Sequence, residues 1–307
     1  MLGVTHSSFR IGVDGGGTKT NLILIDAAGA VVAQRRSTGC NPSLIGQPAA
    51  RQLLTENLDA LVAEACSLHA DAAITHTVLC MAGSRTFWNE FTAQLVERGE
   101  GQSYDDSIPV LELATGGRPG LILHSGTGSF VAARDAEGTA HYAGGLGWRF
   151  GDPASAYELG RRAVARTILE LQGWADPSAL GEAIRKSTGI HTANALTRHF
   201  YADAMPHVHV AEIAPTVTAL AATGDAAAVE IIRSSATELA EIARVVVERA
   251  LPGAHHKKMA VGLSGVILQT PTARAALAAS LGDDRDFRPI TEPPIEGVRQ
   301  LLLRLCS

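Results

Sequence analysis

The feature that most constrains the fold is a short pattern that occurs twice: an apolar strand, a glycine turn edged by hydroxyl residues, and a second apolar strand. Near the start of the chain, residues 10–26 carry it around Asp14-Gly15-Gly16-Gly17-Thr18-Lys19-Thr20. In the second half, residues 121–134 repeat it around Ser125-Gly126-Thr127-Gly128-Ser129. This repetition predicts two related α/β halves that face each other.

The length and composition fit two ordinary globular domains. The chain has 307 residues, of which 46% are apolar and 19% are charged, which is enough for a sizeable core and unlike a disordered protein. The turn-rich residues 115–120 are the expected boundary. We therefore predict an N-terminal domain over residues 1–117 and a C-terminal domain over residues 118–307, with a last helix, 295–305, that packs back on the N-terminal domain.

Charge, cysteine spacing and hydropathy exclude several classes of function. The 26 Lys and Arg against 31 Asp and Glu give a net charge of −5, so no basic surface for nucleic acid or an anionic membrane is expected. Cys40, Cys66, Cys80 and Cys306 form no close pair, which argues against a disulfide framework or a cysteine zinc site and favours a reducing cytoplasm. Because the sequence shows neither an export signal nor a run of about 18 apolar residues, we expect no membrane span.

Hydrophobic periodicity predicts a mixture of strands and helices, with the second half mostly helical. Further strands are expected at residues 30–35, 75–81, 109–113 and 259–262. Helices are expected at residues 48–66, 87–96, 153–171, 194–203, 210–222, 225–251 and 295–305. Asp225 is a suitable N-cap for the longest of these helices.

The first glycine turn has the composition of a phosphate site. Three glycines remove every Cβ from the bend, so backbone N–H groups can approach an anion, and Thr18 and Lys19 add a hydroxyl and a positive charge. Asp14, at the end of the strand, is placed to hold Mg²⁺ beside phosphate oxygens. The structural alternative is a hairpin turn, which needs only two glycine-like positions. Walker and dinucleotide loops are excluded because a strand, and not a helix, follows this turn.

Two further glycine-rich segments extend the pattern. The second turn, residues 125–129, repeats the hydroxyl-flanked glycines, so the two turns together are expected to clamp the phosphates of one nucleotide. The third segment is Gly144-Gly145-Leu146-Gly147-Trp148-Arg149-Phe150-Gly151-Asp152. Asp152 and Pro153 are suited to begin a helix as N-cap and first helical residue, whereas the four glycines indicate close approach of a ligand or another segment.

These motifs together resemble the acetate and sugar kinase, Hsp70 and actin superfamily. Within it the chain is similar to the N-acetylglucosamine kinase group and to the BadF/BadG/BcrA/BcrD-type ATPases, and the resemblance spans nearly the whole chain. It implies two ribonuclease H-like (actin-like ATPase) domains around a central cleft. It also implies an ATP- and Mg²⁺-dependent kinase that phosphorylates a small amino sugar such as N-acetylglucosamine or glucosamine.

The resemblance carries roles over to matching residues. It implies that Asp14 serves the magnesium. The implied nucleotide contacts are Gly15, Gly16, Gly17, Thr18, Lys19, Gly126, Thr127, Gly128 and Ser129 for the phosphates, and Gly262, Ser264 and Gly265 for the adenosine. The implied sugar contacts are Asn41, Gly83, Ser84, Gly145 and Asp152.

The sequence departs from the family pattern at the general base. These kinases carry an aspartate on a short helix, at the end of the strand that precedes the second phosphate turn. Residues 111–117 indicate that several residues, including this aspartate, are lost. Glu112 is the nearest carboxylate and is the expected substitute, with Asp152 as the alternative. The tryptophan of the glycine-rich signature is also displaced, by two positions, to Trp148.

Three functions therefore stay open. The first is an amino-sugar kinase, since a positioned base contributes roughly 100- to 10,000-fold and a kinase can retain slow activity without it. The second is a catalytically impaired nucleotide- or sugar-binding protein of the same fold. The third is the activator ATPase of a radical dehydratase, which the scattered cysteines disfavour. A monomer and a homodimer are both compatible with the sequence.

Overall fold

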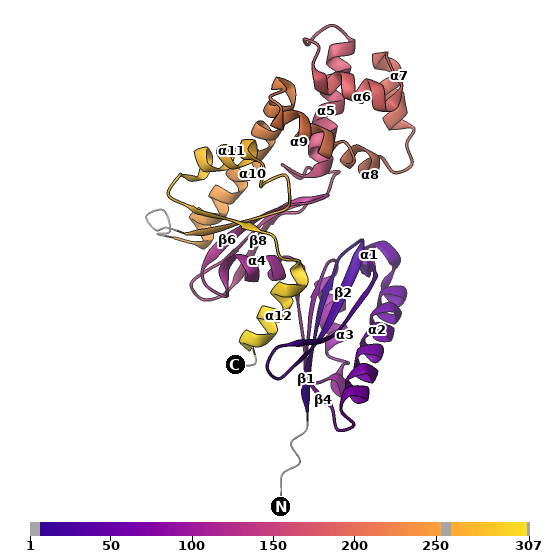
Figure 1. Ribbon diagram of the computed structural model, residues 1–307, viewed down its shortest axis with the longest axis vertical. Helices are drawn as coiled ribbons and strands as arrows, with labels where there is room; N and C mark the ends of the chain where they lie inside the picture. Colours follow the sequence, from indigo (N-terminus) through magenta and orange to yellow (C-terminus); the bar gives the residue numbers. More distant parts are fainter. Residues whose placement is uncertain (1–6, 253–258, 306–307) are drawn as a thin grey trace, which may run out of the picture. The chain divides into compact units, whose positions relative to one another are not determined.

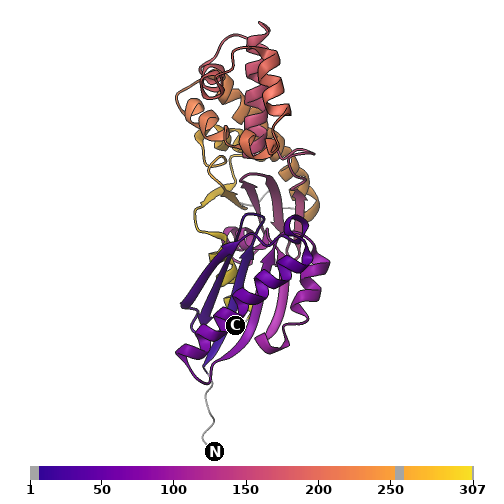
Figure 2. The same cartoon turned by 90° about the vertical axis from the view of Figure 1, so that its right-hand side faces the viewer.

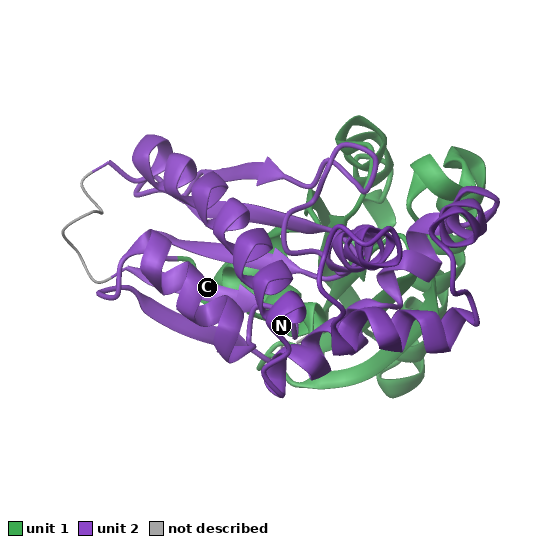
Figure 3. Ribbon diagram, turned by 90° about the horizontal axis from the view of Figure 1, so that it is seen from above, with its two compact units in different colours: residues 1–117, 292–307 green, residues 118–291 purple. Residues whose placement is uncertain are grey.

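The computed structural model describes residues 7–252 and 259–305, so Cys306 lies outside the described part. The chain divides into two compact units (Figure 3). Unit 1 comprises residues 1–117 and 292–307, and unit 2 comprises residues 118–291. The C-terminal helix α12 (Pro294–Leu305) therefore belongs to unit 1.

Unit 1 is built on a five-stranded mixed sheet in the order β3-β2-β1-β4-β5. The hairpin strands β1 (Ser8–Gly15), β2 (Lys19–Asp26) and β3 (Val31–Thr38) are antiparallel. On the other side of β1, β4 (Ala73–Met81) and β5 (Glu100–Asp105) run parallel to it. The carboxyl ends of β1, β4 and β5 therefore lie at one edge of the sheet.

Helices cover both faces of this sheet. Helix α2 (Gln47–Leu68) crosses one face (Figure 2) and buries Ala50, Leu54, Leu58, Leu61 and Ala65, which recur every three or four residues along one side of the helix. Helix α12 lies on the opposite face, where a Cβ on Gly12 would stand only 2.9 Å from Cγ1 of Val298. The remaining helices of the unit are α1 (Pro42–Ile45), α3 (Arg85–Thr92), the 3₁₀ helix η1 (Val96–Arg98) and α4 (Ile108–Thr115).

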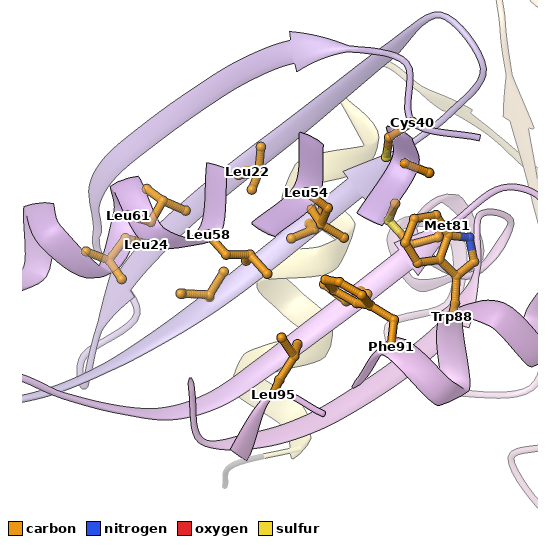
Figure 4. Packing of buried hydrophobic residues seen from close by; sticks show 14 of the residues in the cluster. Leu22, Leu24, Cys40, Leu54, Leu58, Leu61, Met81, Trp88, Phe91 and Leu95 are labelled. Carbon is orange, nitrogen blue, oxygen red and sulfur yellow. The ribbon is translucent and has the colours of Figure 1, made fainter. Parts of the chain in front are cut away.

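The core of unit 1 lies between the sheet and helices α2 and α3 (Figure 4). Leu22 and Leu24 from β2 meet Leu58 and Leu61 from α2, and all four are fully buried. Trp88 of α3 is also fully buried, and its indole Nε1 donates to the carbonyl oxygen of Ala82 at 2.9 Å. This bond satisfies the one polar atom of the largest core side chain.

Unit 2 repeats the sheet of unit 1 strand for strand. Its order is β10-β9-β6-β7-β8. The strands β6 (Gly120–Ser125), β7 (Ser129–Arg134) and β8 (Ala140–Gly144) are antiparallel, and β9 (Ala260–Ser264) and β10 (Asp286–Ile290) are parallel to β6. The expected α/β class with a duplicated strand, glycine turn, strand unit is therefore confirmed.

The helices of unit 2 fall into two groups (Figure 1). Helices α10 (Ala226–Ala250) and α11 (Pro271–Leu281) pack on the sheet. As expected, Asp225 caps α10 by accepting from the N–H of Ala228 at 2.8 Å. A second core joins the helices α5 (Ala156–Leu171), α6 (Ala179–Thr188), α7 (Ala193–Tyr201) and α9 (Ala214–Ala222) to α10 and α11. The short helix α8 (Pro206–Ala211) packs against α5. Within residues 7–252 and 259–305, no helix is long and apolar enough to cross a membrane.

The structure differs from the sequence expectations at several places, and the helices α1, α6 and α11 and the strands β8 and β10 were not expected. Residues 109–113, expected as a strand, belong to helix α4, which is buried on nearly all sides and so shows no helical periodicity. The strand β5 was not expected, because its residues are polar and only partly buried. The expected helix 210–222 is divided into α8 and α9.

The start of helix α5 also needs a correction. Ser155, and not Asp152, is its N-cap, and its Oγ accepts from the N–H of Glu158 at 3.1 Å. Asp152 lies outside the helix, and its Oδ1 accepts from the backbone N–H of Gly147 at 3.1 Å. The sequence Asp152-Pro153 is a plausible helix start, but the helix begins at Ala156, so Ser155 is the residue in the N-cap position.

Candidate functional site

The first glycine turn joins β1 to β2 in unit 1. The N–H of Gly16 donates to the carbonyl oxygen of Lys19 at 2.9 Å, which closes the turn. Gly17, Thr18 and Lys19 are exposed, and in the described part of the chain the amides of Gly17 and Thr18 make no backbone hydrogen bond. Free amides beside an ammonium group are suited to bind an anion such as phosphate.

Asp14 lies at the carboxyl end of β1, opposite Asn21 in the register of β2. The Nδ2 group of Asn21 donates to Oδ2 of Asp14 at 3.3 Å. Burial raises the pKa of the Asp14 carboxyl, while the hydrogen bond from Asn21 and the nearby charge of Lys19 lower it. The carboxylate of Asp14 is thus held in place beside the first glycine turn.

A second pair of carboxylates lies at the same edge of the sheet. Asp105 ends β5, two strands from β1, and Asp106 follows it directly before helix α4. Burial raises the pKa of Asp106 to about 7, helped by the negative charges of Asp105 and Asp14. A partly buried acid whose pKa is close to neutrality is typical of a general base.

Glu112 has a different environment. It lies on α4, its side chain is 2% exposed, and its Oε1 and Oε2 accept from Nε and Nη2 of Arg304 at 2.9 and 3.1 Å. Both oxygens are therefore engaged by the guanidinium of α12. This ion pair gives Glu112 a structural role that was not expected, in place of the expected role as base.

The expected sugar loop packs directly against the first turn. A Cβ on Gly39 would lie 2.1 Å from the carbonyl oxygen of Gly17, so residues 39–41 touch the turn through the backbone. Asn41 caps α1 by accepting from the N–H of Ser43 at 2.9 Å. Gly83, with a φ of +98°, is so close that a Cβ there would stand 2.5 Å from Oδ1 of Asn41. Ser84 caps α3, so Asn41, Gly83 and Ser84 are brought together as a group.

In unit 2 the second turn and the expected adenosine segment are also in contact. The N–H of Gly126 donates to the carbonyl oxygen of Gly128 at 2.8 Å. Gly265, with a φ of +97°, approaches so closely that a Cβ there would lie 1.7 Å from the carbonyl oxygen of Ser125. Gly262 pairs with Ile122 in the parallel register of β9 and β6. The carboxyl ends of β6 and β9 therefore form one continuous surface.

Asp152 fixes the second turn to the glycine-rich segment. It is buried, and backbone N–H groups of Gly147, Ser129 and Leu146 are bonded to its carboxylate. Burial is the largest influence on its pKa and raises it. Gly145 donates its N–H to the carbonyl oxygen of Ser129 at 3.0 Å. Asp152 thus acts as a scaffold of the loop, with its oxygens occupied by amides.

The donor set suits a magnesium ion better than a metal held by protein alone. Within the described residues, no group of three or more His, Cys, Asp or Glu side chains is arranged to hold a metal. Mg²⁺ needs only one or two carboxylates when phosphate oxygens and water complete its shell. The ordered carboxylate of Asp14 fits that requirement.

Comparison with known proteins agrees with this arrangement. Residues 11–296 match the family described as "BadF/BadG/BcrA/BcrD ATPase family". The chain belongs to this ATPase family. The match includes both glycine turns, the Asp105-Asp106 pair and the glycine-rich segment.

Relatives of this chain include kinases. The N-acetylmuramic acid/N-acetylglucosamine kinase of Clostridium acetobutylicum is 23% identical over 267 residues, which is 85% of each chain. The N-acetyl-D-glucosamine kinase of Dictyostelium discoideum is 26% identical over 181 residues, 54% of this chain and 56% of the relative. A solved "Putative N-acetylglucosamine Kinase" from Chromobacterium violaceum is 27% identical, with a TM-score of 0.73, over 96% of this chain and 98% of that one.

Asp105 and Asp106 were not among the site residues expected from the sequence. The signal was present: two adjacent acids stand directly before a proline-containing helix start, Ser107-Ile108-Pro109. The family pattern puts an aspartate between a strand end and a short helix, and β5 and α4 are such a strand and helix. Because residues 109–113 were expected to form the strand that precedes this aspartate, the aspartate was expected after residue 113 and not at residues 105–106.

Proposed function

We propose that this protein is an ATP-dependent kinase that transfers the γ-phosphoryl group to a hydroxyl of an amino sugar such as N-acetylglucosamine or glucosamine. The observation that carries the proposal is the composition of one edge of unit 1. A phosphate-type turn, a candidate magnesium carboxylate (Asp14) and an acid with a pKa of about 7 (Asp106) lie at that edge, and the loop of Asn41 touches the turn. The two named N-acetylglucosamine kinases among the relatives support the choice of substrate.

The nucleotide is assigned to the two glycine turns. In this proposal the amides of residues 17–18 and 127–128, which make no backbone hydrogen bond in the described part of the chain, and the ammonium of Lys19 bind phosphate oxygens. Gly262, Ser264 and Gly265 contact the adenosine. Asp14 would hold Mg²⁺, which neutralises charge on the transferred group. The chain's own contribution is alignment: Asn21 orients the carboxylate of Asp14, and Asp152 fixes the second turn through three backbone amides.

The sugar is assigned to Asn41, Gly83, Ser84 and Gly145, with Asp106 as general base. The carboxylate of Asp106 would accept the proton of the attacking hydroxyl, and its pKa of about 7 makes this transfer favourable near neutral pH. Asp105 keeps this pKa high, because two adjacent carboxylates resist double ionisation. With Asp106 available, the lack of a base no longer argues for the impaired binding protein.

The test is product formation. The purified chain is incubated with ATP, Mg²⁺ and a panel of amino sugars and neutral hexoses, and ADP and phosphorylated sugar are quantified. We expect stoichiometric ADP and sugar phosphate with at least one N-acetylated or free amino sugar. Sugar-independent ATP hydrolysis alone, or no turnover with measurable ADP binding, would contradict the kinase and favour an ATPase or a binding protein.

A further inference from the structure

His124 occupies the last position but one of β6, directly before the second glycine turn. It pairs with Phe130 of β7 and with Ser264 of β9 in the sheet register. The imidazole stacks on Phe130 with ring centroids 4.7 Å apart at 21°, and its Nδ1 lies 3.0 Å from Oγ of Ser264. Contacts on two sides thus fix the orientation of the ring.

The other ring nitrogen faces the turn. Nε2 of His124 lies 3.3 Å from the position that a Cβ on Gly126 would take. Across residues 7–252 and 259–305, Nε2 has no hydrogen-bond partner. Nε2 of His124, held against the second turn, therefore retains one unused hydrogen-bonding position.

The protonation state decides what that position offers. Burial lowers the pKa of His124 to about 4, so the ring is neutral near pH 7 and carries one proton. If the hydroxyl of Ser264 donates to Nδ1, this proton resides on Nε2, which then becomes a donor. A neutral donor suits a phosphate oxygen beside the amides of Thr127 and Gly128, which make no backbone hydrogen bond in the described part of the chain.

We propose that Nε2–H of His124 binds a phosphate oxygen of the nucleotide held at the second turn, and that Ser264 is a positioning residue that fixes the required tautomer. The inference rests on the proposed function only in that the second turn binds nucleotide phosphate. It adds a side-chain donor to a turn that otherwise offers backbone groups and the hydroxyl of Thr127, since the hydroxyls of Ser125 and Ser129 donate to the carbonyl oxygens of Ala154 and Pro153. It also gives Ser264 a role through the imidazole.

Two substitutions of His124 distinguish the roles of its two ring nitrogens. The amide of Gln reaches the position of Nε2, whereas the amide of Asn reaches only that of Nδ1. Affinity for ADP with Mg²⁺ is measured by calorimetric titration. We expect His124→Gln to stay within about 3-fold of the wild type and His124→Asn to bind roughly 10- to 100-fold more weakly, the usual effect of losing a hydrogen bond to a charged group. His141→Asn, on β8 and ion-paired with Asp135, is the control and should bind as the wild type does.

Nitrogen-15 NMR of the wild-type imidazoles supplies a readout that needs no stable variant. We expect the proton of His124 on Nε2, a shift of that resonance on addition of ADP with Mg²⁺, and a mixed tautomer in Ser264→Ala. A proton on Nδ1, or equal ADP affinity of the Asn and Gln variants, would overturn the inference. Absence of ADP binding by the wild type would overturn the proposed function as well, so the two failures are distinguishable.

Discussion

Arg304 of helix α12 and Glu112 of helix α4 form a two-pronged ion pair, with N–O distances of 2.9 and 3.1 Å, across 192 residues of sequence. The side chain of Glu112 is 2% exposed and that of Arg304 is 40% exposed. The pair joins the last helix of the chain to the helix that follows the candidate catalytic acids. This geometry indicates that Glu112 stabilises unit 1 through its ion pair with Arg304.

That assignment predicts the effect of removing the arginine. Arg304→Ala leaves a buried carboxylate without its main partner, and we expect the free energy of unfolding to fall by about 1–3 kcal/mol. Glu112→Gln should cost less, since a neutral amide is easier to bury, and should change kcat less than about 10-fold. Denaturant unfolding and steady-state kinetics of both variants check this. A loss of activity in Glu112→Gln of more than about 100-fold, with unchanged stability, would restore Glu112 as the base.

The raised pKa of Asp106 predicts a pH dependence of stability. The folded state holds this proton up to about pH 7, whereas an unfolded aspartate loses it near its ordinary value of 3.8. The native state therefore binds more protons between these values, and stability falls as the pH rises through this window. Asp106→Asn removes the cost of ionising the buried acid. We expect the variant to be more stable than the wild type at pH 8, by about 1–3 kcal/mol, and nearly equal to it at pH 4. Thermal unfolding at the two pH values is the measurement, and a lower Tm of the variant at pH 8 would contradict the placement of this carboxyl.

The close approach of Gly83 to Asn41 predicts a defect on the sugar side. A Cβ at residue 83 would clash with Oδ1 of Asn41, and its φ of +98° adds backbone strain. We expect Gly83→Ala to raise the KM for the sugar about 10-fold or more, because Asn41 must move, while the KM for ATP changes little. Gly138→Ala is the matched control, since its φ is +87° but, apart from its two chain neighbours, no described residue has an atom within 4 Å of the added methyl. It should lose similar stability, roughly 1–2 kcal/mol, with an unchanged KM. An equal KM for both variants would argue against a sugar role of this loop.

Asp14 is expected to be essential for turnover and dispensable for folding. Asp14→Asn keeps the shape and the hydrogen bond from Asn21, and it removes a charge that burial disfavours. We expect a Tm equal to or above that of the wild type and a loss of at least roughly 100-fold in magnesium-dependent kcat/KM. The control is Asp26→Asn at the other end of β2, where the carboxylate accepts from the N–H of Ala30. Activity of Asp14→Asn close to that of the wild type would show that the ion is held elsewhere.

The sequence was sufficient for the repeated units and for the glycine turns. A strand of alternating or continuous apolar residues with glycines at its end is a local signal, and β1, β2, β6 and β7 all carry it. Helices α2 and α10 were equally clear, because one side of each is apolar at helical spacing. These elements also place Asp14 and the two turns at strand ends.

What the sequence did not reveal depends on contacts between distant segments. Strand β5 is a partly exposed edge strand without an apolar pattern, and α4 is buried on nearly all sides, with α12 packed against it. Because β5 was not expected and α4 was expected to be a strand, Asp106 was not recognised as a candidate base and Glu112 was expected in that role. The partner of Glu112 is Arg304, and no local pattern indicates a pair that distant in the chain. The role of Asp152 depends in the same way on amides that fold back onto its carboxylate.

The most direct test of the account is sugar-dependent ADP release by the wild type, Asp106→Asn and Glu112→Gln, measured side by side with ATP, Mg²⁺ and N-acetylglucosamine or glucosamine. We predict turnover by the wild type, retention within about 10-fold by Glu112→Gln, and a loss of about 100- to 10,000-fold in Asp106→Asn with ADP affinity intact. Turnover by Asp106→Asn at the rate of the wild type, or no amino-sugar-dependent ADP release by any of the three, would contradict it.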